Sequence, residues 1–136
     1  MEEAASHEGG ASGRGGDILW RWGNPHMYLA GTRLDQKLFC QHSSLFVPAD
    51  CPGDDHILVF NNGRNPDRLW SDVLEIELPD GDDGSFLRDS SGAFLPADAC
   101  WRYGPRVGRA GSFYCTHISG CQRLPNGNTL ITQGTW

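Results

Sequence analysis

The chain has 136 residues and a formal net charge of -6 at pH 7, and 38% of its residues are hydrophobic, which suits one small soluble domain with a modest core. Its 17 acidic residues outnumber 11 basic ones without any Lys/Arg-rich patch, so nucleic acid is not expected as a partner. No apolar run approaches the about 20 residues that a membrane helix needs. Residues 1–16 lack the basic and apolar regions of a secretory signal, and no compartment is indicated.

The five cysteines, at positions 40, 51, 100, 115 and 121, form no CxxC pair. A zinc ribbon or a thioredoxin-like motif is therefore not expected, and the sequence offers no tight cluster of metal ligands. We expect buried or idle thiols, with one disulfide as the main alternative. Neither a metal nor a cofactor is predicted.

The 18 glycines and 8 prolines favour many turns over long helices. Residues 1–16 predict a loop or linker, because they combine glycine, serine and charge without periodicity. Aromatic and β-branched runs bounded by Gly, Pro and Asn predict strands, and nothing predicts a helix. The expected strands are residues 17–22, 39–47, 56–60, 70–78, 99–103, 112–124 and 129–132.

The segments between these strands carry turn signals. Residues 48–55 (PADCPGDD) predict a turn, residues 79–96 an acidic Gly/Ser-rich loop, and residues 125–128 (PNGN) a tight hairpin. Along the WSDVLEIEL run, Glu75 and Glu77 alternate with apolar residues, which predicts a half-exposed strand.

An internal repeat organises these strands. WRWGNP at residues 20–25 matches WRYGP at residues 101–105, and each is followed by a strand with a Cys-x-His, ending at His42 or His117. Each of those leads through a turn into an apolar strand, ILVF or TLIT. Such a unit is typical of a β-propeller blade, although a β-sandwich with chance similarity is the alternative. We therefore expect an all-β fold, a partial β-propeller of about two four-stranded antiparallel blades.

The repeat predicts that residues 17–136 are an incomplete propeller. Propellers close a ring of at least about four blades, and this chain holds about two. It stops at Trp136, just after a strand, with no partner strand to follow. We therefore expect a fragment of a longer propeller, with the remaining blades missing from this chain, that exposes strand edges which normally pair.

Polar side chains gather at the ends of the expected strands. His42 lies near the start of one, and Asn61, Asn62 and Arg64 leave the end of the next. A histidine, two amides and a guanidinium on neighbouring strand ends suit the binding of an oxyanion. His117 occupies the matching position in the second repeat. The alternatives are histidines satisfied by backbone, a solvated loop arginine and two ordinary turn asparagines.

Four segments carry a resemblance to a known family. GGDILWRWGNP, DQKLFCQHSSLFVP, CPGDDHILVFNNGR and FYCTHISGCQRLPNGNTLIT resemble the arylsulfotransferase family of β-propellers, and the resemblance covers nearly the whole chain. It implies a PAPS-independent transfer of a sulfuryl group from an aryl sulfate donor to a phenolic acceptor, without a cofactor. Relatives in that family are often periplasmic or secreted.

The resemblance also implies roles for single residues. His117 of THISG falls where a channel histidine is transiently sulfated, and His42 of QHSS falls where a second histidine assists. Arg64, after FNNG, falls where an arginine binds the sulfuryl group. Asn61 and Asn62 are the candidate amide donors to the sulfuryl oxygens.

The chemistry suits these residue types. Neutral imidazole is a nucleophile and, once sulfated, a good leaving group, so it divides the transfer into two steps. Arginine and protonated histidine would stabilise the charge on the sulfuryl oxygens, and a second histidine can protonate the leaving phenolate. Ser43 departs from the family, in which Asp or Asn more often follows this histidine, and the family's earlier His-bearing blade is absent here.

Two other functions are open. A non-catalytic propeller segment for binding or scaffolding would fit an enzyme-like sequence that has lost its other blades. A quinoprotein-dehydrogenase-like propeller also uses repeated Trp, but its AxxGxxxWxxxxG repeat is absent. Trp20, Trp22 and Trp101 are expected to pack blades rather than to bind substrate. We expect the isolated chain to be inactive, aggregation-prone or oligomeric.

Overall fold

The computed structural model describes residues 18–79, 81, 85–105 and 113–134. The chain divides into two compact units. The first comprises Met1–Gln36 and Pro79–Ala97, and the second comprises Lys37–Leu78 and Asp98–Trp136. The linker predicted for residues 1–16 lies outside the described residues.

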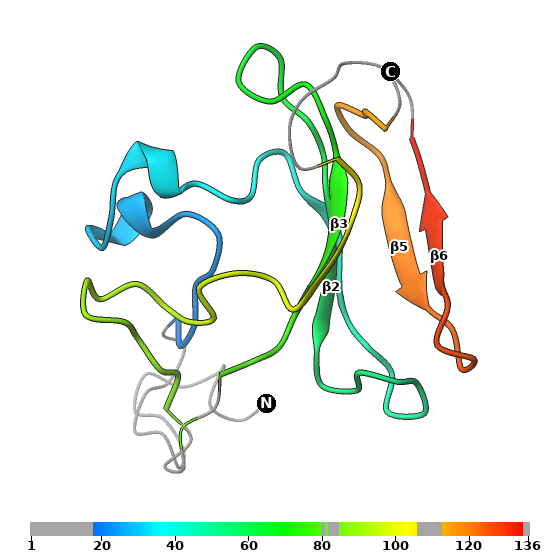
Figure 1. Cartoon of the computed structure of the whole chain (residues 1–136), viewed down its shortest axis with the longest axis horizontal. Coiled ribbons are helices and arrows are strands. Elements are labelled where there is room, and N and C mark those ends of the chain that lie inside the picture. The colour runs from blue at the N-terminus through cyan, green and yellow to red at the C-terminus, as the bar shows by residue number, and fades with distance from the viewer. Residues whose placement is uncertain (1–17, 80, 82–84, 106–112, 135–136) are drawn as a thin grey trace. The chain divides into compact units, whose positions relative to one another are not determined.

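The second unit contains two antiparallel sheets (Figure 1). Each strand of the larger sheet pairs with the next along the chain, in the order β1 (His42–Phe46), β2 (Ile57–Asn61), β3 (Asp72–Ile76) and β4 (Trp101–Tyr103). A separate hairpin, drawn in orange and red, consists of β5 (Gly120–Arg123) and β6 (Thr129–Thr132). The prediction of a mostly β-stranded chain is confirmed, whereas its division into propeller blades stays a prediction.

The core of this unit lies between the two sheets. Leu58 and Phe60 of β2 share a face with Val73 of β3, because alternate residues of a strand point the same way and Phe60 pairs with Val73. Phe60 packs against Phe113, with ring centroids 5.5 Å apart. Burial of each such side chain contributes about 1.5–3 kcal/mol. The cluster comprises Val47, Cys51, Leu58, Phe60, Val73, Cys115 and Cys121, with Phe113 and Ile131 packed against it.

β3 is more buried than its alternating sequence predicts. All five of its residues are buried, because β2 and β4 flank the strand and its two carboxylates are paired with arginines. Asp72 contacts two arginines and Glu75 contacts Arg123. Glu77, which lies just beyond the strand, is exposed. The prediction of a half-exposed strand is therefore wrong.

The β5–β6 hairpin follows its sequence signal. Leu124 N donates to Asn128 O at 2.8 Å, and Gly127 N donates to Leu124 O at 2.9 Å. Gly127 has a φ of 84°, which glycine adopts without the strain that a Cβ would bring. The turn predicted at residues 125–128 is therefore confirmed.

The strand predicted at residues 112–124 is too long. β5 begins at Gly120, and residues 113–119 form bends and irregular backbone outside any strand. Ser71 N donates to Phe113 O at 2.9 Å, so this stretch bonds to the chain just before β3 instead of to β6. The strand predicted at residues 129–132 is present with the same bounds as β6, and those predicted at residues 39–47, 56–60, 70–78 and 99–103 are present, with different ends, as β1, β2, β3 and β4.

The first unit contains short helices and loops in its described residues. η2 (Pro25–Tyr28) and η3 (Arg33–Asp35) are single turns of 3₁₀ helix, and Thr32 caps η3 in a capping box with Asp35. The Tyr28 ring packs edge-on against Phe94, with centroids 5.6 Å apart. Across the described part of the chain, no helix is both long enough and apolar enough to cross a membrane.

Trp20 and Trp22 hold the long acidic loop. Their indole N–H groups donate to Leu95 O at 2.9 Å and to Pro96 O at 2.7 Å. The strand predicted at residues 17–22 is wrong for residues 18–22, because bonds from these side chains to backbone take the place of strand pairing. Both tryptophans are half-buried and Trp101 is exposed, and the prediction that the three pack propeller blades stays a prediction.

All five cysteines are free thiols, so the disulfide alternative is wrong. Cys51, Cys115 and Cys121 are buried, whereas Cys40 and Cys100 are exposed. Burial raises the pKa of Cys121 to about 11, which keeps it protonated and unreactive at neutral pH. The expectation of buried thiols therefore holds for three of the five cysteines.

We expect a thiol reagent such as DTNB to modify two cysteines in the folded protein and all five in denaturant. The reason is that the thiolate is the reacting form and the core both excludes the reagent and disfavours that form. Absorbance of the released thiol gives the count. Cys40→Ser should lower the native count by one and Cys121→Ser should leave it unchanged. Modification of Cys121 in the folded chain would contradict the described core.

Candidate functional site

His42 is held at the start of β1 by two oxygen atoms. Its Nδ1 lies 3.0 Å from Asn62 Oδ1 and 3.2 Å from Cys40 O. His42 pairs with Phe60 across the sheet, so it lies beside the end of β2, of which Asn61 is the last residue and after which Asn62 comes. The predicted proximity of this histidine to the two asparagines is therefore present in the structure.

The orientation of the Asn62 amide follows from its other contacts. Its Nδ2 lies 3.3 Å from Cys115 O and 3.1 Å from Ser119 Oγ. A backbone oxygen only accepts, so the NH₂ group faces Cys115 and Oδ1 faces His42. Asn62 is wholly buried, so these contacts satisfy an amide that water does not reach.

These contacts also fix the tautomer of His42. Both oxygens near Nδ1 are acceptors, so Nδ1 carries the proton and donates to them. The neutral imidazole then holds its lone pair on Nε2. Nε2 is therefore the atom of His42 that can take up a proton or attack an electrophile.

His117 lies in a bend between Cys115 and the start of β5. Its side chain is exposed, and its Nδ1 lies 2.7 Å from Thr116 Oγ1. Because a hydroxyl can donate or accept, this contact is compatible with either tautomer. The prediction that His117 lies within a strand, as His42 does, is wrong.

Both histidines are followed by a residue with a left-handed backbone. Ser43 has a φ of 50° and Ile118 has a φ of 49°. For a β-branched residue such a φ is a genuine outlier that costs about 1–3 kcal/mol. In β1 it accompanies an irregular register between His42 and Leu45. The sequence repeat therefore extends to the backbone conformation after each histidine.

The two histidine segments lie next to each other. A Cβ on Gly120 would lie 3.2 Å from Ser43 Oγ, so the start of β5 passes close to the residue after His42. Asn62 joins the same two segments, because it contacts His42 through Oδ1 and Ser119 through Nδ2. The structure thus brings the chain around His117 beside His42.

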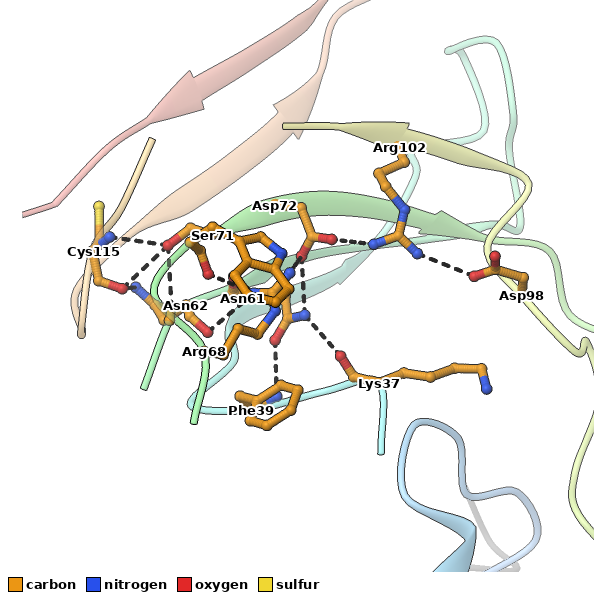
Figure 2. A network of polar contacts seen from close by, with 12 residues as sticks. Lys37, Phe39, Asn61, Asn62, Arg68, Ser71, Asp72, Asp98, Arg102 and Cys115 are labelled. Carbon is orange, nitrogen blue, oxygen red and sulfur yellow. Dashed lines mark hydrogen bonds and ion pairs between the residues drawn. The ribbon is translucent and has the colours of Figure 1, made fainter. Parts of the chain in front are cut away.

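Ser71 ties the His117 segment to the larger sheet. Its hydroxyl accepts from Gly63 N at 3.1 Å and from Cys115 N at 2.9 Å, and it donates to Cys115 O at 3.2 Å. Figure 2 shows Ser71 and Asn62 converging on Cys115. The backbone just before His117 is therefore fixed at both its N–H and its carbonyl.

Asn61 is saturated by contacts within the protein. Its Nδ2 donates to Lys37 O at 2.9 Å and to Asp72 Oδ1 at 3.0 Å, and its Oδ1 accepts from Phe39 N at 2.8 Å (Figure 2). The residue is wholly buried. Asn61 thus fastens the chain before β1 to the end of β2.

A buried ion pair supports the turn after β2. Arg68 NH2 lies 2.7 Å from Asp72 Oδ1, and 4% of the arginine side chain and none of the aspartate side chain is exposed. The guanidinium also donates to Asn61 O at 3.2 Å and to Trp70 O at 2.8 Å. It lies over the Trp70 and Phe39 rings, 4.8 and 5.6 Å from their centroids. Burial lowers the pKa of Arg68, and the carboxylate of Asp72 opposes that shift.

A second arginine shares the same carboxylate. Asp72 Oδ2 pairs with Arg102, which comes from the middle of β4 and also reaches Asp98 at 3.1 Å (Figure 2). Removing one partner of a buried pair leaves a charge without compensation, which is far costlier than losing a surface pair. Asp72 therefore connects β3, β4 and the turn that carries Arg68.

Arg64 lies in an exposed turn. Its side chain is 57% exposed, and its Nε lies 3.1 Å from Asp67 Oδ2. Such a surface pair contributes only about 0.2–1 kcal/mol, so Arg64 can exchange Asp67 for another anion at little cost. The ion pair of its side chain is thus with Asp67 and not with His42, Asn61 or Asn62.

The assignment of these residues to catalysis and substrate binding stays a prediction. In the structure the two asparagines are buried and position their neighbours. Sequence reasoning missed the residues that hold the site together, namely Arg68, Ser71, Asp72 and Ser119. The available signal was the Asp72 carboxylate directly before the apolar residues Val73 and Leu74, because a buried charge needs a partner.

Comparisons with known proteins give no relative for this chain. No model of a protein family matches it, and searches of curated proteins and of solved structures find no similar protein. The resemblance to the arylsulfotransferase family therefore rests on the sequence segments that carry it.

We expect Asp72→Ala to lower the free energy of unfolding by about 3–5 kcal/mol, because it leaves the buried Arg68 guanidinium without its carboxylate. Urea denaturation followed by tryptophan fluorescence measures the change. The matched control is Asp67→Ala, which removes the exposed partner of Arg64 and should cost less than about 1 kcal/mol. Equal losses in the two variants would show that the buried network does not stabilise the fold.

We expect Asn62→Leu to weaken the tautomer preference of His42, because only the Cys40 carbonyl then remains as an acceptor for Nδ1. Nitrogen-15 NMR above the titration range of the imidazole should show a proton on Nδ1 in the unaltered chain, because Asn62 and Cys40 offer only acceptors there. In the variant the two ring nitrogens should move towards a mixture of tautomers. Asn128→Leu, at an exposed turn position, is the control. A proton found on Nε2 in the unaltered chain would overturn the assignment.

Proposed function

We propose that this chain is a segment of an arylsulfotransferase-like β-propeller, in which His117 and His42 transfer a sulfuryl group between phenolic compounds. The observation that supports it most is the pair of Cys-x-His segments, each followed by a left-handed residue and joined to the other through Asn62. Backbone strain of this kind concentrates at functional sites, where the surrounding structure maintains it.

In the first step, a ring nitrogen of His117 attacks the sulfur of an aryl sulfate. The N–S bond forms while the S–O bond to the aryl group breaks, and the phenolate leaves with the bonding electrons. His42, when protonated at Nε2, gives that proton to the leaving oxygen. The fixed Nδ1–H of His42 supports this role, because it directs proton exchange to one nitrogen.

In the second step, the acceptor phenol loses its proton to His42 Nε2 and attacks the sulfur. The new S–O bond forms as the N–S bond breaks, and His117 regains its lone pair. His42 ends the cycle protonated, as it began. The same two side chains therefore serve both half-reactions, which accounts for a donor and an acceptor that are both phenolic.

The sulfuryl group is anionic, and the proposal requires a cation near it. Arg64 is the candidate, because its exposed pair with Asp67 is inexpensive to break. A guanidinium that turned from Asp67 to the sulfuryl oxygens would stabilise the charge shared among them in the transition state. Asn62 acts in this scheme as a positioning residue for His42, not as a contact to the substrate.

The strand order supports the propeller part of the proposal. β1 to β4 form a four-stranded antiparallel meander, which is the strand order that a propeller blade would have, and β5 and β6 form a second sheet that packs against it. Among the described strands, β6 pairs with β5 alone. An open pocket of about 840 Å³ lies beside it, between Ile131 of β6 and the aromatic rings of Trp101 and Tyr103. Further strands of a second blade would pair with β6 and cover these rings.

A second candidate function is a non-catalytic segment for binding or scaffolding. The same pocket favours it, because an aromatic surface beside an unpaired strand edge suits a partner strand that adds to the sheet. This function needs neither histidine to react with a substrate. The experiment below separates the two candidates.

We expect the longer propeller that this proposal implies, mixed with 4-nitrophenyl sulfate and quenched rapidly, to carry one sulfuryl group on the peptide that contains His117. Intact-mass and peptide analysis detect it. His117→Ala should abolish the modification and lower phenol sulfation by about a thousandfold or more. His42→Ala should slow both steps by about 10²–10⁴-fold and still permit the modification.

His26→Ala, which alters a histidine of the first unit, is the control and should behave as the unaltered protein. Phenol sulfation that survives His117→Ala would overturn the assignment of the nucleophile. Absence of both sulfation and phenol transfer in the unaltered longer protein would favour the non-catalytic segment.

A further inference from the structure

We propose that His56, Glu75 and Cys100 form a binding site for a zinc-like divalent cation. The three residues come from separate parts of the chain: His56 directly precedes β2, Glu75 lies in β3, and Cys100 directly precedes β4. One nitrogen, oxygen or sulfur atom of each lies within 4.8 Å of the other two. These three residues are far apart in the sequence, and the pairing of β2, β3 and β4 brings them together.

This cluster is separate from the site around His42. It lies beside the first residue of β2, whereas His42 and Asn62 lie at the other end of the same strand. The two ends are roughly 20 Å apart along an extended chain. The cation site therefore does not depend on the proposed sulfuryl transfer.

The spacing of the donor atoms suits one small cation. His56 Nδ1 lies 2.9 Å from Glu75 Oε1 and 3.8 Å from Cys100 Sγ. A tetrahedral zinc ion, with bonds of about 2.0 Å to nitrogen and 2.3 Å to sulfur, holds those two atoms about 3.5 Å apart. Small side-chain rotations would open the nitrogen–oxygen pair to the distance that the same geometry needs.

The use of a single histidine nitrogen distinguishes a cation site from a catalytic triad. In a Cys-His-Glu triad the thiol meets one ring nitrogen and the carboxylate meets the other. Here Cys100 and Glu75 both approach Nδ1 of His56. The three donor atoms of His56, Glu75 and Cys100 thus lie close to one another, as the ligands of a single bound cation do.

Glycine at position 53 leaves room for the cation. A Cβ there would lie 2.5 Å from Glu75 Oε1 and 3.5 Å from His56 Nδ1. The residue also has a φ of 86°, which favours glycine. The backbone of Gly53 thus comes close to two of the donor atoms, and a side chain at this position would collide with the Glu75 carboxylate.

Contacts around the cluster hold the ligands in place. Cys100 N donates to Glu75 O at 2.9 Å, and the Cys100 thiol donates to the same oxygen at 3.2 Å. Arg123 pairs with Glu75 Oε2, which leaves Oε1 towards the cluster. Only 8% of the Glu75 side chain and 26% of the His56 side chain is exposed. Support of this kind for a ligating carboxylate orients it for a metal.

The chemistry of the donors selects the kind of cation. A thiolate, an imidazole and a carboxylate together favour zinc over magnesium or calcium, which prefer oxygen ligands. Binding of the ion displaces the thiol proton of Cys100, and the resulting thiolate, with the Glu75 carboxylate that also pairs with Arg123, supplies negative charge to a divalent ion. Three protein ligands leave a fourth position, on the exposed side of Cys100, for water or a small ligand.

Titration of the full chain with Co²⁺ under reducing conditions tests the site, because tetrahedral Co²⁺ with a thiolate ligand gives visible bands and a near-ultraviolet charge-transfer band. We expect both to saturate at one Co²⁺ per chain and to disappear when Zn²⁺ is added. Cys100→Ser should remove the charge-transfer band, and His56→Gln should weaken binding by at least about tenfold.

Cys40→Ser provides the matched control, because Cys40 is the other exposed thiol, and it should keep the bands unchanged. Circular dichroism of each variant shows that its fold is retained. A charge-transfer band that persists in Cys100→Ser but is lost in Cys40→Ser would overturn the assignment. So would a titration of the unaltered chain that shows no tetrahedral Co²⁺ spectrum.

Discussion

The buried carboxylate of Asp72 is the group on which the larger sheet and its candidate site depend. It is shared by Arg68 from the preceding turn, by Arg102 from β4 and by the amide of Asn61. Burying these charges is costly in itself, and it becomes favourable only because every partner is present at once. Arg68 also binds the backbone oxygen of Asn61, so the same interaction fixes where the chain leaves β2.

The position and protonation of His42 follow from that fixed point. Asn62 comes next in the chain, and its amide is oriented by Cys115, whose backbone Ser71 holds from the other side. The oriented amide then leaves only an acceptor for Nδ1 of His42. A buried ion pair thus decides, through ordinary hydrogen bonds, which nitrogen of a half-buried histidine can react.

Most strands of the second unit and its PNGN turn could be predicted from the sequence, because their signals are local. The PNGN turn and the apolar ILVF and TLIT runs each specify their own structure. The strand predicted at residues 17–22 is absent from its described residues 18–22, whose tryptophans bond to a loop distant in sequence. The prediction that Glu75 lies on the exposed face of its strand was wrong for a similar reason. Its partners, His56 and Arg123, come from other parts of the chain.

The two histidine segments of the candidate site could be picked out from the sequence. The residues that hold these segments in place could not. Two Cys-x-His segments can be recognised as a repeat, but which amide, hydroxyl or arginine reaches them depends on strand pairing. Arg64 and Arg68 show the limit, because two arginines in one turn have opposite environments, one exposed and one buried. Nothing in their local sequence distinguishes the exposed Arg64 from the buried Arg68, which supports the sheet.

The left-handed residues after the histidines are the strongest reason to seek a function at this end of the sheet. A bend that served only to connect two elements would be made at lower cost by glycine or asparagine than by Ile118. The strained conformation is imposed from outside: Gly134 packs so closely on the carbonyls of His117 and Ile118 that any side chain there would collide with them. Ser119 then bonds to both Gly134 N and Asn62, which continues the constraint to His42. The left-handed backbone after each histidine is thus held by contacts of the residues that follow it, and maintained strain of this kind is common at functional sites.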